Sequence, residues 1–143
     1  MKKAISVVIF LIAFIFVLPS CASRRMGIEE CNWKMRCVMH GGEEGVIVDA
    51  VGREDGAHPD AKIIDMTLVA EDGKITIFDF TNNKTYDGTY SVENKTPAGT
   101  DYKITINGIT GYATVAFTSY KDGGKEPTLP INLGTHSLYF YAE

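Results

Sequence analysis

Apolar and polar residues alternate along most of the chain from residue 32 onward, with the period of two that is typical of β-strands. Turn signals separate these stretches. The strongest are Asp72 with Gly73 and Asn107 with Gly108, because glycine accepts the positive φ of a tight hairpin. No window has the period of an amphipathic helix. Nine strands are predicted, at residues 33–40, 46–51, 63–70, 74–80, 89–93, 102–106, 109–120, 128–133 and 138–142.

The predicted strands are short, and turn signals recur about every 8 to 12 residues, as in antiparallel barrels and sandwiches. Short connections favour a meander over crossing connections. We therefore expect an all-β domain, a small antiparallel meander β-barrel of eight or nine strands, with a β-sandwich as the alternative. Pro127 and Pro130 have no N–H to donate, so residues 128–133 are expected to form an edge strand or no strand.

The first predicted strand has one apolar face. Successive side chains of a strand point to opposite sides, so the alternation predicts which residues face the core. Those expected in the core are Trp33, Met35, Cys37 and Met39, and those expected outside are Lys34, Arg36, Val38 and His40. Methionine and cysteine also bind copper(I), but on one strand face they lie about 7 Å apart, too far to share an ion without a partner strand. We interpret this face as core.

Catalytic and metal-binding patterns are sparse in the rest of the chain. His40, His58 and His136 are scattered, without the spacing of metal ligands. Acidic residues are spread through the predicted turns, so no pair of carboxylates is suited to acid–base catalysis. The serines lack any motif for a nucleophile. The sequence therefore predicts no enzyme, no metal site and no cofactor.

The chain begins with Lys2 and Lys3, followed by an apolar run at residues 4–18. This combination is typical of a secretory signal peptide. The run ends at residues 18–21 (Leu-Pro-Ser-Cys), which resemble the lipobox of bacterial lipoproteins. The resemblance implies cleavage before Cys21 and lipidation of that cysteine, and hence a membrane anchor in the cell envelope. No aspartate follows Cys21, so the outer membrane is the expected location.

Three regions follow from these patterns: a signal peptide at residues 1–20, the lipidated cysteine with a flexible tether at residues 21–30, and a β-barrel domain at residues 31–143. The length of 143 residues, 45% of them hydrophobic and 22% charged, is ordinary for one globular domain. The formal net charge of −4 gives no electrostatic basis for nucleic-acid binding.

Cys31 and Cys37 remain once Cys21 is assigned to the lipid. An even pair in an oxidising compartment favours a disulfide. However, six residues of straight strand separate two Cα atoms by about 20 Å, whereas a disulfide needs less than about 7 Å. Either the chain bends sharply near Asn32 or Trp33, or the two thiols do not pair with each other.

Two further patterns resemble the small lipocalin-like and META-type β-domains of bacterial lipoproteins. Trp33 opens the first strand, and residues 82–90 (Asn-Asn-Lys-Thr-Tyr-Asp-Gly-Thr-Tyr) follow the Asp72 and Gly73 hairpin. The resemblance covers the region from Trp33 to about Leu133. It implies a fold more than an activity, because members are mostly envelope proteins of undefined or stress-related role. Some related small domains bind ligands or inhibit enzymes.

Tyrosines are the main resource for recognition, because their side chains combine an apolar ring with a polar hydroxyl. The residues expected to line a ligand or partner surface are Tyr86, Tyr90, Tyr102, Tyr112, Tyr139 and Tyr141. The leading hypothesis is a non-catalytic, lipid-anchored protein whose barrel binds a small ligand or an envelope component. The alternatives are an inhibitor of a protease or lysozyme, presenting residues 52–59 or 94–100, and a structural or stress accessory.

Overall fold

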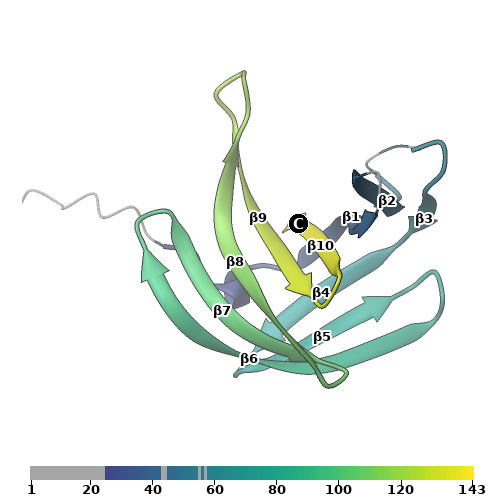
Figure 1. Cartoon of the computed structure of the whole chain (residues 1–143). Coiled ribbons are helices and arrows are strands. Elements are labelled where there is room, and N and C mark those ends of the chain that lie inside the picture. Colours follow the sequence, from purple (N-terminus) through teal and green to yellow (C-terminus); the bar gives the residue numbers. More distant parts are fainter. Residues whose placement is uncertain (1–24, 43–44, 55, 57) are drawn as a thin grey trace, which may run out of the picture.

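A computed structural model describes residues 25–42, 45–54, 56 and 58–143 (Figure 1). The predicted signal peptide and Cys21 lie outside these residues. The described chain forms one short 3₁₀-helix, η1 (Ile28–Glu30), and ten strands. The strands are β1 (Trp33–Gly42), β2 (Gly45–Gly52), β3 (Lys62–Ile64), β4 (Met66–Glu71), β5 (Lys74–Asp79), β6 (Lys84–Thr96), β7 (Gly99–Ile106), β8 (Ile109–Ser119), β9 (Lys125–Leu133) and β10 (His136–Ala142).

Eight of these strands, β1 and β4 to β10, form a closed antiparallel barrel. From β4 to β10 each strand pairs with the next in the sequence, and β10 pairs with β1 to close the sheet. The prediction of an all-β meander barrel is therefore confirmed. Strands β2 and β3 are additional: β2 pairs with the second half of β1, and β3 runs parallel to β2. Among the described residues, no helix is long and apolar enough to cross a membrane.

The barrel has two different ends. At the first end lie the β4–β5, β6–β7 and β8–β9 turns, and the β8–β9 hairpin projects well beyond the sheet (Figure 1). At the second end lie the β5–β6, β7–β8 and β9–β10 turns, together with β2 and β3. Strand β1 pairs with β4 only at Trp33 and Lys34, and from Cys37 onward its partner on that side is β2. We call the first end, with the β8–β9 hairpin, the closed end, and the second end, with β2 and β3, the open end.

Helix η1 seals the closed end. Ile28 is only 1% exposed and packs in the core against Trp33 and Tyr102. The Trp33 Nε1–H donates to the Ile28 carbonyl at 2.7 Å, and the Ile28 N–H donates to the Tyr102 hydroxyl at 3.0 Å. Residues 28–30, expected to belong to the tether, are therefore part of the barrel domain. A buried apolar side chain and two hydrogen bonds hold them there.

The core face of β1 changes at Arg36, and the predicted alternation is wrong beyond it. Arg36 is the extra residue of a β-bulge, because Met35 pairs with Phe140 and Cys37 pairs with Tyr139. One extra residue reverses which side chains point inward. Val38 consequently packs against the core, where Cys37 and Met39 had been expected.

The proline-containing strand β9 is not at an edge, contrary to the prediction. It pairs with β10 along residues 128–133 and with β8 on its other side. The β8–β9 pairing is interrupted at Leu129 and Pro130 and resumes in the same register. The barrel thus tolerates Pro130 by leaving a local gap in one ladder, where proline has no N–H to donate. Leu129 itself is fully buried.

Candidate functional site

A cavity of about 450 Å³ occupies the open end of the barrel. This volume lies within the range of pockets that hold small organic ligands. Its wall is mostly aliphatic, with a few polar groups. The lining residues are Val38, Asp49, Ala50, Lys62, Ile64, Met66, Ile77, Tyr86, Ile106, Asn107, Ile109, Leu133, His136 and Leu138.

The cavity exists because the two ends are filled by side chains of different size. The closed end is filled by Trp33, Tyr102, Phe140 and Ile28, all with 3% exposure or less. The inward side chains at the open end are smaller, and the departure of β1 from β4 widens the wall there. Space that large aromatic rings fill at one end is thus left open at the other.

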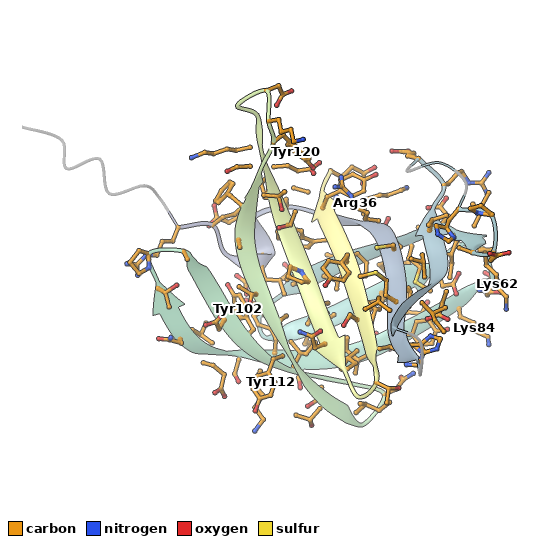
Figure 2. All side chains as sticks on the ribbon, turned by 45° about the horizontal axis from the view of Figure 1, so that its top comes forward. Arg36, Lys62, Lys84, Tyr102, Tyr112 and Tyr120 are labelled. Atoms are coloured by element: carbon orange, nitrogen blue, oxygen red, sulfur yellow. The ribbon has the colours of Figure 1, made fainter. Side chains whose placement is uncertain are left out.

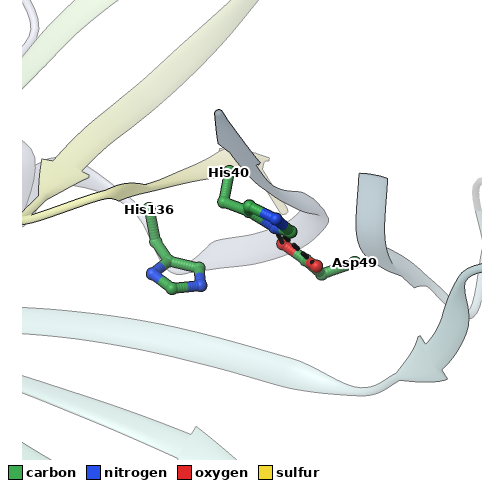
Figure 3. A group of neighbouring side chains, drawn as sticks. All are labelled: His40, Asp49 and His136. Atoms are coloured by element: carbon green, nitrogen blue, oxygen red, sulfur yellow. Dashed lines mark hydrogen bonds and ion pairs between the residues drawn. The ribbon is translucent and has the colours of Figure 1, made fainter. Parts of the chain in front are cut away.

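Three ionisable side chains meet beside this cavity: His40 of β1, Asp49 of β2 and His136 of β10 (Figure 3). His40 and His136 are direct cross-strand partners, and their ring centroids are 5.6 Å apart. The His40 Nδ1 lies 2.6 Å and 2.8 Å from the two Asp49 carboxylate oxygens. Asp49 and His136 line the cavity wall.

Two β-bulges bring this cluster together. The bulge at Arg36 turns His40 to the same side as His136. In β2, Ala50 pairs with Val38 and Val48 pairs with Met39, which leaves Asp49 as the extra residue of a second bulge. Bulges commonly redirect a side chain near a functional site. Without the first bulge, the alternation predicted for β1 would place His40 on the outside.

The three histidines are scattered along the sequence. The predicted fold nevertheless indicates that two of them meet, because the first and last strands of a closed meander barrel must pair. The end of the first strand then meets the start of the last, which places His40 and His136 together. His58 is not a member of this cluster.

The six tyrosines expected to form one surface are distributed over the barrel. Only Tyr86 lines the cavity. Tyr102 is buried at the closed end, and the Tyr90 ring meets it edge-on at 5.7 Å. Tyr112 is 59% exposed on the outer face of β8. Figure 2 shows Tyr102 and Lys62 at opposite ends of the barrel.

Tyr141 contacts Arg36 on the outer face of the barrel. The Arg36 guanidinium lies 4.9 Å from the centre of the Tyr141 ring. It also donates to the Tyr120 hydroxyl at 3.0 Å and to the Glu126 carboxylate at 2.9 Å. Tyr139 pairs with Cys37 and Pro130 across the sheet, so it shares this outer face. Neither Tyr139 nor Tyr141 is among the residues that line the cavity.

Cys31 and Cys37 do not form a disulfide with each other. Cys31 lies beside η1 at the closed end, half-buried against the core. Partial burial, and to a lesser extent the neighbouring Glu30 carboxylate, raises the pKa of the Cys31 thiol. Cys37 lies on the outer side of β1, after the bulge. The side chains therefore belong to different parts of the barrel.

The residues that carried the resemblance to lipocalin-like and META-type domains have structural roles. Trp33 anchors η1, as described above. Asn82 donates from its backbone N–H and its side-chain amide to the two oxygens of Asp79, at 3.0 Å and 2.7 Å. Asp79 is 2% exposed, and Asn83 has a positive φ of 51°. The paired asparagines thus build the β5–β6 turn at the open end.

The chain was compared with models of protein families, with characterised proteins and with solved structures, and no significant match was found.

Proposed function

We propose that this protein is a lipid-anchored, non-catalytic protein of the cell envelope whose barrel binds a small amphipathic molecule. The observation that carries the proposal is the open-end cavity of about 450 Å³. Its aliphatic wall suits an apolar body, because burial of apolar surface contributes about 25 cal/mol per Å². Lys62, Asn107 and His136 supply polar groups for one hydrophilic end of the molecule.

The proposed anchor is compatible with an accessible cavity. The first described residues, Arg25 and Met26, lie beside the β6–β7 turn at the closed end. A lipid on Cys21 would therefore attach the barrel by its closed end, opposite the cavity. Since the anchoring strength comes from the acyl chains, Cys21→Ala is expected to move the protein from the membrane pellet to the soluble fraction. A variant that stays in the pellet would contradict lipidation.

Uptake of a neutral fluorescent probe tests the cavity. We expect N-phenyl-1-naphthylamine to bind with a 1:1 stoichiometry and a rise in emission. Leu138→Trp places a bulky indole ring in the cavity wall and should weaken probe binding at least tenfold. Tyr112→Trp is the matched control, because it adds a tryptophan on the outer face. Equal probe binding by both variants would show that the probe does not bind in the cavity. That result would contradict the proposal and favour a structural accessory role.

One observation favours the alternative of a protein-directed inhibitor. The β8–β9 hairpin projects beyond the barrel (Figure 1), and Phe117 and Tyr120 on it are 50% and 42% exposed. The expected loop at residues 94–100 is instead part of β6 and β7, with a tight turn at Pro97 and Ala98. Inhibition of a panel of envelope proteases and lysozymes, lost in Phe117→Ser, would support this alternative over ligand binding.

A further inference from the structure

The His40, Asp49 and His136 side chains have the arrangement of a ligand set. One nitrogen or carboxylate oxygen from each lies within 4.8 Å of those of the other two. They come from three different strands, β1, β2 and β10, so the sheet itself determines their spacing (Figure 3). The side chains of His40 and Asp49 are 31% and 33% exposed, and His136 is exposed, so an ion can reach them.

We propose that His40, Asp49 and His136 bind a divalent transition-metal ion of the zinc class at the rim of the cavity. Histidine and aspartate are both established Zn²⁺ ligands, and three protein ligands with an exchangeable fourth position occur in zinc enzymes. Calcium and magnesium favour sets made entirely of oxygen ligands. The two histidines therefore select against these hard cations.

The geometry needs only a small adjustment to hold the ion. At zinc–ligand distances of about 2.0–2.1 Å, the ligand atoms of a tetrahedral site lie about 3.3 Å apart. The His40 and Asp49 atoms, now joined by a hydrogen bond at 2.6 Å, would separate by less than 1 Å. The ion takes the place of the proton between them. The ligand nitrogen of His136, which lies within 4.8 Å of the other two ligand atoms, would approach them by up to about 1.5 Å through rotation of its side chain, exposed at the first position of β10.

The remaining coordination position would face the cavity, because Asp49 and His136 belong to its wall. Water or a polar group of a cavity ligand would complete the site. Ion binding itself does not depend on the proposed function, since all three ligands belong to the protein. It is therefore expected with or without a small molecule in the barrel.

Calorimetric titration of the full chain with zinc, purified without a histidine tag, tests the proposal. We expect one ion per chain with a dissociation constant below about 10 µM. His40→Gln, Asp49→Asn and His136→Gln should each weaken binding about tenfold or more, and His58→Gln should leave it unchanged. Calcium should produce no binding in the same range. Unaltered far-UV circular dichroism would show that the variants remain folded.

Side-chain nitrogen spectra of the histidines provide a second measurement that does not depend on affinity. Zinc should shift the ring resonances of His40 and His136 and leave those of His58 in place. Zinc binding of equal strength in His40→Gln and His136→Gln would overturn the proposal. So would the absence of any binding up to about 100 µM zinc. Failure of the probe experiment, by contrast, would affect the proposed ligand function alone.

Discussion

The closed and open ends of the barrel are made by the same eight strands, yet their side chains are used differently. At the closed end, Ile28, Trp33 and Tyr102 are almost completely buried, and the polar atoms between them form hydrogen bonds. At the open end, the aliphatic wall surrounds a cavity of about 450 Å³, and His40 and Asp49 share a hydrogen bond at its rim. We therefore expect the closed end to contribute more to stability and the open end to be available for binding.

The difference between the two ends suggests how a small barrel remains folded with a cavity inside it. An empty apolar cavity forfeits the dispersion contacts that side chains would make across it. Here Ile28 of η1 and the buried aromatic residues Trp33, Tyr102 and Phe140 pack at the closed end, and we expect their burial to offset that loss. Four predictions test this division, and the expected effects decrease from the first to the last.

Trp33→Ala should have the largest effect on stability. Trp33 is 0% exposed, and its indole N–H bonds to the Ile28 carbonyl. Removing a buried aromatic ring costs about 3–5 kcal/mol, and the carbonyl would also lose its donor. Urea unfolding should measure this loss. Phe117→Ala, at an exposed aromatic position, should change the free energy of unfolding by less than about 1 kcal/mol. Equal effects of the two variants would contradict a stabilising role of the closed end.

A matched pair of leucines compares the two environments directly. Leu129 is 0% exposed in the core, whereas Leu138 lines the cavity. Leu129→Ala should cost about 3 kcal/mol or more, because it creates a void in a packed region. Leu138→Ala enlarges a space that already exists, so we expect a loss of about 1–2 kcal/mol. The difference should appear in urea midpoints at an unchanged slope, and its absence would mean that the open end is packed as tightly as the core.

Tyr102→Phe should have a smaller effect that is confined to the closed end. The variant keeps the buried ring but leaves the Ile28 N–H without its acceptor. An unsatisfied buried donor costs about 1–3 kcal/mol. Hydrogen exchange at the Ile28 amide should become faster. Tyr112→Phe on the exposed face should change neither this exchange rate nor the free energy of unfolding. An unchanged exchange rate would mean that this hydrogen bond does not hold η1 in place.

The sequence predicted the fold class well because alternation and turn residues act locally. Asp72 and Asn107 adopt positive φ, each in the hairpin that it and the following glycine predicted. Trp33 and Met35 are in the core, as the alternation indicated. The prediction failed where packing with a distant strand decides the outcome. Proline at position 130 is tolerated because the β8–β9 ladder is interrupted there, which no local pattern of β9 reveals.

The candidate site was harder to predict, since it depends on two single-residue bulges. Nothing in the apolar alternation of β1 distinguishes Arg36 as an extra residue, yet it determines the side on which His40 lies. Asp49 is likewise placed by a bulge in β2. Barrel closure supplied a partial clue to the pairing of His40 with His136. The cavity itself follows from side-chain volumes summed over many strands, which the sequence order does not show.

The smallest predicted effect concerns the thiol of Cys31, which extends the comparison to the edge of the closed end. Burial first, and the Glu30 carboxylate second, raise its pKa. A thiol whose pKa is higher in the folded state than in the unfolded state retains its proton longer as the pH rises. The contribution of this thiol to the free energy of unfolding is therefore fully present at pH values below the pKa of the unfolded state. This contribution is lost as the pH rises through the raised pKa of the folded state. Because Cys31 is half-exposed, only a slight decrease in stability is expected in the alkaline range.

Alkylation kinetics measure the same property more sensitively, since the thiolate is the reacting form. At pH 8, iodoacetamide should modify Cys31 more slowly in the native protein than in the same chain in urea. The tryptic peptide of residues 26–34 contains Cys31 as its one cysteine, so mass spectrometry can follow it alone. Glu30→Gln should speed the native reaction by removing the neighbouring negative charge. Native and unfolded rates that coincide would show that η1 leaves the Cys31 thiol as accessible to water as in the unfolded chain, and the closed end would then stop short of this residue.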